Sequence, residues 1–429
     1  MSGSISRRRF VQASAAVAGT LAMGSCIQGA NDRVRLGFIG VANRGSQLLE
    51  ATLVHKDAQV VAVCDCYKPA RDRWVEKLEG DVTSHSDFRE ILDRDDIDAV
   101  VIGTPDHWHA IQTIMACDAG KDVYVEKPLS ITIKEGRSMV AAARRNGAVV
   151  QVGTQRRSST LLPQLREYVE SGNIGHVSVA TCYRISNMYP SGIGVADDQE
   201  PPEGLDWDMW LGPRPDRPFN PTIQPYKFRW HGEFSSQVAN WGVHYFDAIR
   251  WLLDEEAPVS VCAMGGQYAV NDMRDIPDTM QATFEFASGR LMTFGQYEAS
   301  GNRAIENDLE LRGTLGTVAA GEQRFTVTPE LAGQFGKPAP LAPEKVVESS
   351  DGDLTVAHIR NFLDCVKSRE KPNADIEIGH RSTTFSLLAN ISLATRSRIE
   401  WDPVKERITS PESANKLLHY KYRSPWKLG

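Results

Sequence analysis

The sequence has no uninterrupted run of about 18 apolar residues, which a permanent transmembrane helix would need. It also has no excess of basic residues, because 48 Lys and Arg stand against 55 Asp and Glu and the net charge is −7. Nucleic-acid-binding proteins carry a basic face, so we expect no nucleic-acid partner. Hydrophobic residues (41%) and charged residues (24%) have ordinary proportions, which excludes fibrous and disordered classes. The 429 residues are enough for two or three domains.

Cysteine pairs with metal-binding spacing are also missing. The 7 cysteines include no Cys-x-x-Cys pair and no histidine partner at such a spacing. Most of them lie in apolar runs, where a free thiol behaves as a small hydrophobic side chain. His107 and His109 lie close together, but without a third ligand nearby they make a poor zinc site. We therefore expect neither disulfides nor a bound metal.

Acidic residues are absent from the first 31 positions. Arg7, Arg8 and Arg9 come first, and an apolar run of small residues from 13 to 25 follows, which is the layout of an export signal. The stretch SRRRFV resembles the twin-arginine signal, which is read by a translocase for folded proteins. We therefore expect a signal over residues 1–30 and a periplasmic or cell-envelope location. The alternative is a frayed, weakly amphipathic N-terminus.

Cys26 follows Met-Gly-Ser, which loosely resembles a lipoprotein cleavage box. Methionine stands where Leu, Val or Ile is usual, so a lipid anchor at Cys26 stays open. It is the only membrane attachment that we expect.

Short, nearly continuous Val and Ile runs alternate with helical patterns up to about residue 155. Such runs indicate strands buried on both faces, and the alternation indicates βαβ units around a parallel sheet. We expect a doubly wound Rossmann domain over residues 31–155. Its strands are predicted at 34–40, 58–65, 97–105, 122–128 and 148–154.

The pattern changes after residue 155 to longer strands joined by tight turns. Ser288-Gly289, with alternating apolar residues on both sides, is the clearest hairpin signal. We expect a C-terminal α/β domain over 156–429 with a large, mostly antiparallel open sheet, whose strands include 176–186, 259–268, 280–298 and 308–320. The Pro-, Gly- and Trp-rich connection 187–231 is too long for an ordinary loop, and long ordered loops are often lids or arms.

A glycine motif follows the first predicted strand and opens a helix. Residues 40–45, Gly-Val-Ala-Asn-Arg-Gly, match GxGxxG except at Ala42. The motif needs a tight turn, a close backbone and helix amides that face a pyrophosphate. Asp65 ends the second strand, where a carboxylate would bond the adenosine ribose and favour NAD over NADP, although Lys68 keeps NADP open. The alternative is a tight strand–helix turn without a ligand.

Two further stretches, TPDHWH (104–109) and YVEKPLS (124–130), end predicted strands at the carboxyl edge of the sheet, where doubly wound folds bind ligands. Together with GFIGVANRG and NWGVHYFD (240–247), they resemble the Gfo/Idh/MocA oxidoreductases, a family named for glucose–fructose oxidoreductase, inositol dehydrogenase and a rhizopine-catabolism protein. The resemblance covers roughly residues 33–429. It implies a Rossmann domain followed by an α/β domain whose open sheet often mediates oligomers, so we expect a homo-oligomer.

The resemblance also implies catalytic roles for three residues. Lys127 would lie beside the nicotinamide and the reacting hydroxyl, before a cis proline at Pro128. His244 would be the acid/base group, with a pKa near neutrality. Asn240 stands where the family usually has Asp, and an amide cannot accept a proton. Asp247, one helical turn beyond His244, is expected to be structural.

The residues expected to hold the cofactor follow from the glycine motif and the resemblance. They are Gly40, Ala42, Asn43, Arg44, Gly45, Asp65, Thr104, Pro105, His109, Glu126, Lys127 and Gln155.

Aromatic residues gather around the long connection. Trp207, Trp210, Trp230 and Trp241, with Asp206 and Asp208, would suit a sugar, and ordinary core burial is the alternative.

The sequence therefore predicts an exported NAD(P)-dependent oxidoreductase with tightly bound cofactor, acting by hydride transfer on a hydroxyl of a sugar, glycoside or polyol. One alternative is a glycosidase that uses NAD transiently: oxidation at C3 acidifies the neighbouring C–H, elimination cleaves the glycosidic bond and reduction follows. The other is a non-catalytic sugar-binding relative, which Asn240 makes conceivable.

Overall fold

The computed structural model describes residues 33–429, except 79, 302–307, 334 and 336. The predicted signal over residues 1–30 and Cys26 lie outside these residues. Among the helices in the described ranges, none is long and apolar enough to cross a membrane. The six cysteines from Cys64 onward are free thiols.

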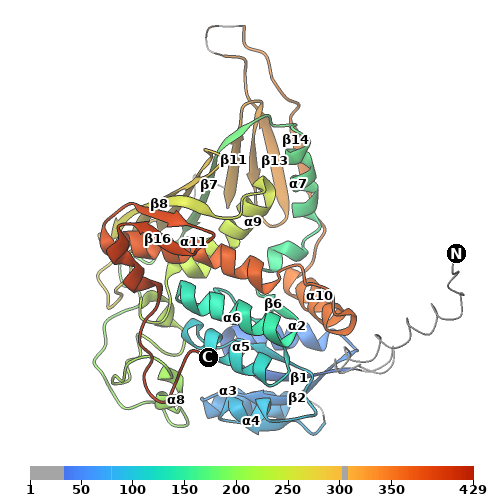
Figure 1. The fold of residues 1–429 in the computed structure, drawn as a ribbon, viewed down its shortest axis with the longest axis vertical. Helices are drawn as coiled ribbons and strands as arrows, with labels where there is room; N and C mark the ends of the chain where they lie inside the picture. Colours follow the sequence, from blue (N-terminus) through green and yellow to red (C-terminus); the bar gives the residue numbers. More distant parts are fainter. Residues whose placement is uncertain (1–32, 79, 302–307, 334, 336) are drawn as a thin grey trace, which may run out of the picture. The chain divides into compact units, whose positions relative to one another are not determined.

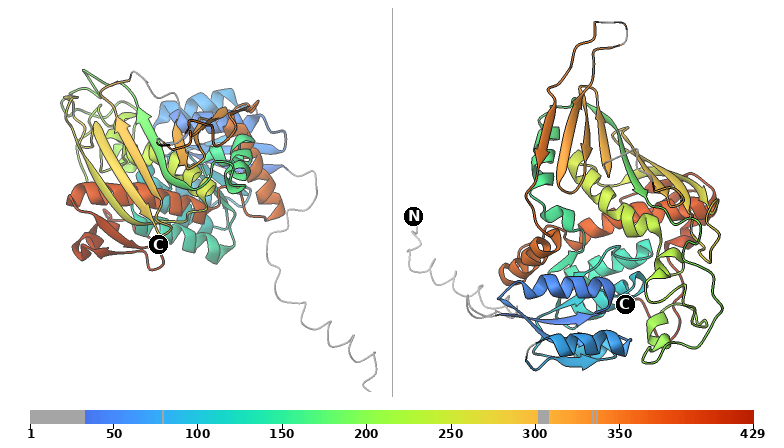
Figure 2. Two further views of the ribbon diagram at one scale, coloured as in Figure 1. Left: turned by 90° about the horizontal axis from the view of Figure 1, so that it is seen from above. Right: turned by 180° about the vertical axis from the view of Figure 1, so that it is seen from behind.

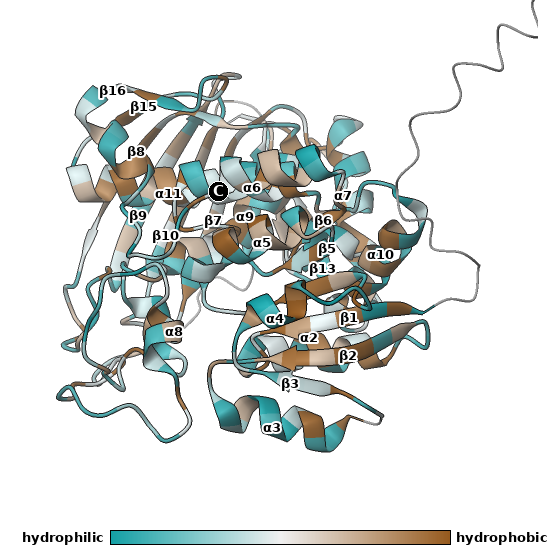
Figure 3. Ribbon diagram, turned by 60° about the horizontal axis from the view of Figure 1, so that its bottom comes forward, coloured by the Kyte–Doolittle hydropathy of each residue, from teal (hydrophilic) through white to brown (hydrophobic). Residues whose placement is uncertain are grey.

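The first domain contains a parallel sheet with the strand order β3-β2-β1-β4-β5-β6 (Figure 1). Val and Ile side chains bury the central strands on both faces, and all four residues of β4 are buried. Figure 3 shows hydrophobic residues along β1 and β2, whereas the short edge strand β3 is pale. The predicted Rossmann fold is confirmed. Its strands are β1 (Val34–Ile39), β2 (Ala58–Cys64), β3 (Thr83–His85), β4 (Ala99–Ile102), β5 (Asp122–Val125) and β6 (Val150–Val152).

Helices connect these strands, and local sequence signals fix their ends. In α6, Thr132 and Glu135 form a reciprocal capping box, and Gly147 closes the helix in the left-handed conformation at φ +60°. The connecting helices are α2 (Asn43–Leu53), α3 (Lys68–Lys77), α4 (Phe88–Leu92), α5 (His109–Asp118) and α6 (Ile133–Asn146).

The second sheet has the order β14-β13-β12-β11-β7-β10-β9-β8-β15-β16. Only the β7–β10 pair is parallel in the described part of this sheet. The hairpin predicted at Ser288-Gly289 is present, with Gly289 at φ +84°, so the mostly antiparallel open sheet is confirmed. Its strands are β7 (Val177–Ile185), β8 (Pro258–Gly266), β9 (Thr279–Phe286), β10 (Leu291–Tyr297), β11 (Leu309–Gly313), β12 (Gly316–Ala320), β13 (Arg324–Pro329), β14 (Lys345–Glu348), β15 (Ile399–Asp402) and β16 (Arg407–Ser410).

Helices α7 (Leu161–Glu170), α9 (Val243–Leu253) and α11 (Ile376–Thr395) contribute side chains to the core against this sheet. Phe246 lies at the centre, with its ring centroid 5.1 Å from Phe284 and 5.8 Å from Phe385. A short π-helix (Val238–Gly242) leads directly into α9. Residues 240 and 244 therefore lie on one nearly continuous helix.

The chain returns to the first domain after completing most of the second. Helix α10 (Leu354–Ser368) inserts Ile359, Phe362 and Val366 into the core that β1 and α2 form. Figure 1 shows α10 beside this part of the Rossmann domain. A domain boundary at residue 155 therefore separates the two sheets. It assigns α10 to the second domain, although this helix packs in the core of the first.

The predicted long connection is largely irregular and includes α8 (Trp207–Leu211). Residues 201–230, which we call the arm, run beside the Rossmann strands in Figure 1 and in the rear view of Figure 2. Backbone bonds attach the arm to the end of β2, from Asp206 N to Cys66 O and from Lys68 N to Gly204 O. The arm is therefore docked on the edge where cofactors bind in such sheets.

Candidate active site

The glycine motif forms a tight turn between β1 and α2. Gly40 has φ +81°, and a Cβ on Gly45 would lie 1.8 Å from Gly40 O, so both positions need glycine. Ala42 has φ −75°, which explains why alanine is tolerated there. No side chain caps the N-terminus of α2. Uncapped first-turn N–H groups suit the phosphates of a dinucleotide.

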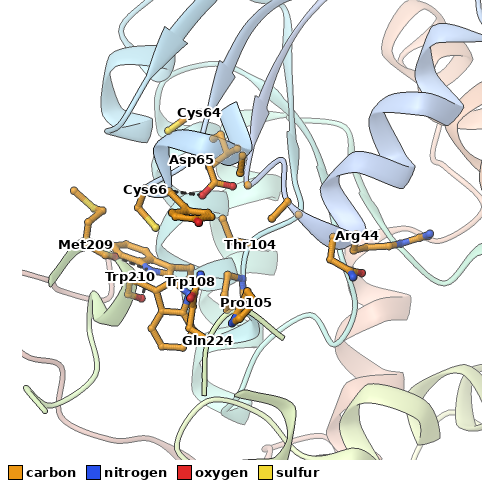
Figure 4. Close-up of a pocket in the computed structure, with 18 of the residues that line it drawn as sticks. Arg44, Cys64, Asp65, Cys66, Thr104, Pro105, Trp108, Met209, Trp210 and Gln224 are labelled. Atoms are coloured by element: carbon orange, nitrogen blue, oxygen red, sulfur yellow. Dashed lines mark hydrogen bonds between the residues drawn. The ribbon is translucent and has the colours of Figure 1, made fainter. Parts of the chain in front are cut away.

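A cavity of about 550 Å³ opens in front of this turn. Its size is ordinary for a cofactor site. Figure 4 shows side chains from the arm facing the ends of β2 and β4 across it. The lining comes from the glycine motif (Gly40, Ala42, Asn43, Arg44), the end of β2 (Asp65, Cys66, Tyr67), the end of β4 (Thr104, Pro105) and the arm (Met209, Trp210, Gln224, Tyr226, Phe228, Arg229).

Asp65 lies at the end of β2, as expected. Its Oδ2 accepts from Val41 N at 2.9 Å, and its Oδ1 accepts from Tyr67 N at 2.9 Å. Burial raises the pKa of this carboxyl, and the backbone donors oppose the rise. Each oxygen keeps a lone pair for a ribose hydroxyl, so the residue fits that role while also fixing the glycine turn.

Arg44 and Glu126 form a pair across the domain. Arg44 Nε lies 2.8 Å from Glu126 Oε1, and Glu126 Oε2 accepts from Lys127 N at 3.1 Å. Burial alone would raise the pKa of Glu126, but the charges of Arg44 and Lys127 outweigh it and lower the pKa. Arg44 reaches the cavity, whereas Glu126 is buried behind it.

His109 does not reach the cavity, and its expected role as a cofactor ligand needs correction. The ring is fully buried, with Nδ1 2.8 Å from Pro128 O and Nε2 2.9 Å from Thr104 O. It therefore ties the Thr104 loop to the cis peptide bond between Lys127 and Pro128. His107 is also buried, with Nε2 2.9 Å from Trp210 O, so it joins the Rossmann domain to the arm.

Gln155 and Gly45 also lie outside the cavity lining. Gln155 begins a 3-10 helix after β6, and its Oε1 is buried without a hydrogen-bond partner in the described ranges. Gly45 faces the backbone of Gly40 instead.

Lys127, Asn240 and His244 come together between the two domains. Lys127 Nζ lies 2.9 Å from Asn240 O and 2.9 Å from Asn240 Oδ1. The side chain of His244 is buried, and its Nδ1 has no hydrogen-bond partner among the residues described. Native structures rarely leave such an atom unsatisfied, so a substrate or water fits there.

The protonation behaviour of these groups differs from the expectation. Burial lowers the pKa of Lys127 to about 8. Burial and the nearby charge of Lys127 lower the pKa of His244 well below its ordinary value. The expected near-neutral pKa of His244 is wrong, and Lys127 is the group that titrates closer to neutrality.

The tryptophan cluster divides into two groups. Trp207 and Trp210 stack with their ring centroids 4.7 Å apart and form a small core with Phe228 and Phe234. For these two residues the alternative interpretation, ordinary burial in a core, applies. Asp206 caps α8, and Asp208 pairs with Arg423.

The other two tryptophans lie against charged groups that sequence reasoning did not identify. Trp230 Nε1 donates to Glu298 at 3.1 Å, and Arg184 lies 3.7 Å over the ring of Trp241. Their positions depend on strands distant in sequence, so no local motif marked them.

Asp247 is structural, as expected, because it accepts from Arg157 and Ser382.

Comparison with known proteins agrees with this architecture. Residues 34–154 match the family model of the oxidoreductase family with an NAD-binding Rossmann fold. Residues 209–319 match the GFO/IDH/MocA C-terminal domain, and residues 336–428 match the oxidoreductase-family C-terminal alpha/beta domain.

Curated relatives include the alpha-N-acetylgalactosaminidase of Shewanella oneidensis and a glycosyl hydrolase family 109 protein of Shewanella sp. strain MR-4. Each is 38% identical over 120 residues, which is 26% of this chain and 26% of the relative. The similarity thus spans about a quarter of these relatives' length.

Similar solved structures share the fold over most of the chain. The WlbA dehydrogenase of Bordetella pertussis, in complex with NADH and UDP-GlcNAcA, has a TM-score of 0.64 and 20% identity, covering 86% of this chain and 99% of that one. A levoglucosan dehydrogenase in complex with NADH and levoglucosan has a TM-score of 0.65 and 18% identity, with the same coverage. The matched domains, in this order and around this cavity, place the chain in the Gfo/Idh/MocA family of NAD-binding oxidoreductases.

Proposed function

We propose that this chain is an exported oxidoreductase that uses tightly bound NAD to oxidise a hydroxyl of a sugar, glycoside or polyol. The observation that carries the proposal is the buried amine of Lys127, held by both oxygens of Asn240 beside the unsatisfied His244 Nδ1. Lys127 itself lies within residues 34–154, which match the family's NAD-binding domain, and Asn240 and His244 come from the second domain.

Lys127 can act as the general base in this arrangement. A neutral lysine has two N–H groups and one lone pair, and Asn240 accepts both N–H groups. The lone pair is then left for the proton of a substrate hydroxyl. A pKa of about 8 suits such a base at physiological pH. Bound nicotinamide would supply the hydride acceptor for the carbon that carries this hydroxyl.

His244 supports the reaction as a neutral hydrogen-bonding group. Its lowered pKa keeps the imidazole uncharged, so it adds no positive charge beside Lys127. Its buried Nδ1 can bond the reacting hydroxyl or the one next to it.

The arm supports tight retention of the nucleotide. Met209, Trp210 and Tyr226 of the arm line the same cavity as Asp65. Export after folding would carry the loaded cofactor to a compartment without an evident NAD pool. A redox-neutral cycle, in which the hydride returns to a substrate, fits that situation.

A second candidate is an NAD-dependent glycosidase, which the named activity of the Shewanella relatives favours. Oxidation of a ring hydroxyl would acidify the neighbouring C–H, elimination would release the aglycone, water would add, and reduction would restore the sugar. Lys127 would serve the oxidation in the same way.

The test uses the full chain purified in its folded form. Mass spectrometry of the denatured protein should detect NAD or NADH. Oxidoreductase activity predicts that the bound nicotinamide is reduced by a sugar and re-oxidised by a carbonyl acceptor, and that the Lys127→Met variant loses both steps. Aglycone release in D₂O, with deuterium entering beside the oxidised carbon, would instead establish the glycosidase. Bound nucleotide that no sugar reduces would support a binding protein and overturn both.

Export has its own test. Replacing Arg7 and Arg8 by Lys should abolish export by the twin-arginine route. Normal export of this double variant would remove the signal assignment and, with it, the argument for loading in the cytoplasm.

A further inference from the structure

Arg229 is a cation of the arm that lines the cofactor cavity. It lies in the short 3-10 helix Lys227–Trp230, and it shares the cavity wall with the glycine motif residues Gly40, Asn43 and Arg44. Arg229 lies outside the Rossmann domain, so the glycine motif did not indicate that this residue lines the cavity.

Aromatic contacts and one backbone hydrogen bond hold the guanidinium group of Arg229, and its charge also acts on the buried carboxyl of Asp106. The Cζ of Arg229 lies 4.3 Å from the ring centroid of Tyr226 and 4.4 Å from that of Phe228. Nη1 donates to Tyr226 O at 3.1 Å. Within the described ranges it forms no ion pair, unlike Arg44, which pairs with Glu126, and Arg217, which pairs with Glu233. Stacking and one hydrogen bond orient the group and leave its other N–H donors for a ligand.

The charges around the cavity favour an anionic ligand at this position. Arg44, Arg73 and Arg229 line the cavity, and Asp65 is the carboxylate among its lining residues. Asp65 lies at the end of β2, where the ribose of the dinucleotide is expected, and it accepts from Val41 N and Tyr67 N, so three arginines outnumber one carboxylate among these lining residues. A diphosphate carries two negative charges, and a planar guanidinium group binds phosphate oxygens with two parallel hydrogen bonds.

We propose that Arg229 binds the diphosphate of the dinucleotide from the arm, across the cavity from the glycine motif. The N–H groups at the start of α2 would approach the same phosphates from the other side. The cofactor would thus be held between two segments of the chain, one of which lies outside the Rossmann domain. This inference depends on NAD binding by the family, and it is independent of the substrate and of the reaction proposed above.

The experiment measures nucleotide affinity, so it needs no substrate. Full-length Arg229→Gln protein, freed of nucleotide, is titrated by calorimetry with NADH, ADP-ribose and adenosine. Loss of a charge-assisted contact predicts about 10- to 100-fold weaker binding of NADH and ADP-ribose. Binding of adenosine, which has no phosphate, should be unchanged. The amount of nucleotide that copurifies with the variant should fall in parallel.

Lys227→Gln is the matched control, since it removes one charge from the same helical turn. The Lys227 side chain donates to Ile193 O and does not line the cavity, so NADH affinity should stay at the wild-type value. Arg229→Lys keeps the charge but loses the planar donor pair, so it should bind NADH with intermediate affinity. If Arg229→Gln fails to fold, the NADH affinity of Arg229→Lys still tests the diphosphate contact.

Three results would overturn the assignment. Unchanged affinity of the Arg229 variants for NADH and ADP-ribose would exclude the diphosphate contact. Equal losses for adenosine and ADP-ribose would show that Arg229 acts only through the shape of the arm. An equal loss of NADH affinity in Lys227→Gln would show that only the net charge of this segment matters, and not a contact made by Arg229.

Discussion

Lys127 Nζ lies 2.9 Å from each of the two oxygens of Asn240, the backbone carbonyl and the side-chain Oδ1. The two residues belong to different domains and are 113 positions apart. An amide holds the amine in place without stabilising its positive charge as a carboxylate would. Burial lowers the pKa of Lys127, and the neutral amide at position 240 does not oppose that shift.

Restoring the carboxylate should change the pH dependence of the reaction. In Asn240→Asp, an anion next to Lys127 would favour the charged amine and raise its pKa by about 1–3 units. The acid limb of kcat/KM for oxidation should then move upward from about pH 8, the pKa of Lys127 in the wild type. Asn240→Ser, which adds no charge, should leave the position of the limb nearly unchanged. An identical pH profile in Asn240→Asp would show that Lys127 is not the titrating base.

In the wild type, the pH dependence of the oxidation rate should follow the fraction of Lys127 that is neutral. The rate of oxidation should rise through about pH 8 and reach a plateau, whereas the rate of reduction, which needs the protonated amine, should fall over the same interval.

The unfolding free energy should also depend on the protonation of Lys127. The unfolded chain binds this proton up to about pH 10.5, so the contribution of Lys127 to the unfolding free energy rises between pH 8 and 10.5. Denaturant titrations of the wild type and Lys127→Met at several pH values would measure this difference.

His244→Ala should retain NAD but lose turnover by about 10²–10⁴-fold, the usual contribution of a group that assists proton transfer. Because burial keeps the imidazole neutral, the wild-type rate should show no ionisation near pH 6.5, its ordinary value. Steady-state kinetics and the nucleotide content of the purified variant check both points. A clear acid limb at pH 6.5 that disappears in the variant would contradict the assignment.

Asp65→Ala should weaken NAD binding and reduce discrimination against NADP, because the carboxylate that repels a 2′-phosphate is removed. The variant also loses the acceptors for Val41 N and Tyr67 N, so the glycine turn should loosen. Asp65→Asn keeps one carbonyl acceptor and separates the two effects. Titration with NADH and NADPH provides the measurement, and an unchanged NADH/NADPH ratio in both variants would contradict the ribose assignment.

Trp426→Ala should release nucleotide faster. Trp426 lies 4.7 Å from Trp108 and 6.2 Å from Phe88 (ring centroids), and both partners line the cofactor cavity. Two lost ring pairs, each worth about 0.5–1.5 kcal/mol, should lower the unfolding free energy by about 1–3 kcal/mol. Stopped-flow displacement of NADH and urea titration test this, with Lys427→Ala as a neighbouring control. Unchanged release would show that the cavity wall does not need Trp426.

The sequence predicted those elements whose signal is local. Val and Ile runs identified β1, β2 and β4, whereas the three polar residues of β3 carry no apolar run and were missed. The turn at Gly289 was found because it needs φ > 0°. The role of α10 in the Rossmann core was not predictable, because its partners lie about 300 positions earlier and no local pattern encodes that contact.

The site was predictable to a similar extent. The glycine motif and Asp65 follow from spacing, and Lys127, Asn240 and His244 were identified through the resemblance to the family. His109 was misassigned because a histidine at a strand end looks the same in sequence whether its ring meets a ligand or two carbonyls. The pKa order of Lys127 and His244 depends on burial, which becomes known only from the tertiary structure.

The return of α10 sets the order in which the molecule can complete its folding during synthesis. The Rossmann strands leave the ribosome first, yet Ile359, Phe362 and Val366 fill the core beside α2. Until residue 368 has emerged, this core has an open apolar face, and the first domain to be translated cannot be the first to finish folding. The nucleotide cavity, built on the same strands, therefore matures late, when nearly all of the chain is already present.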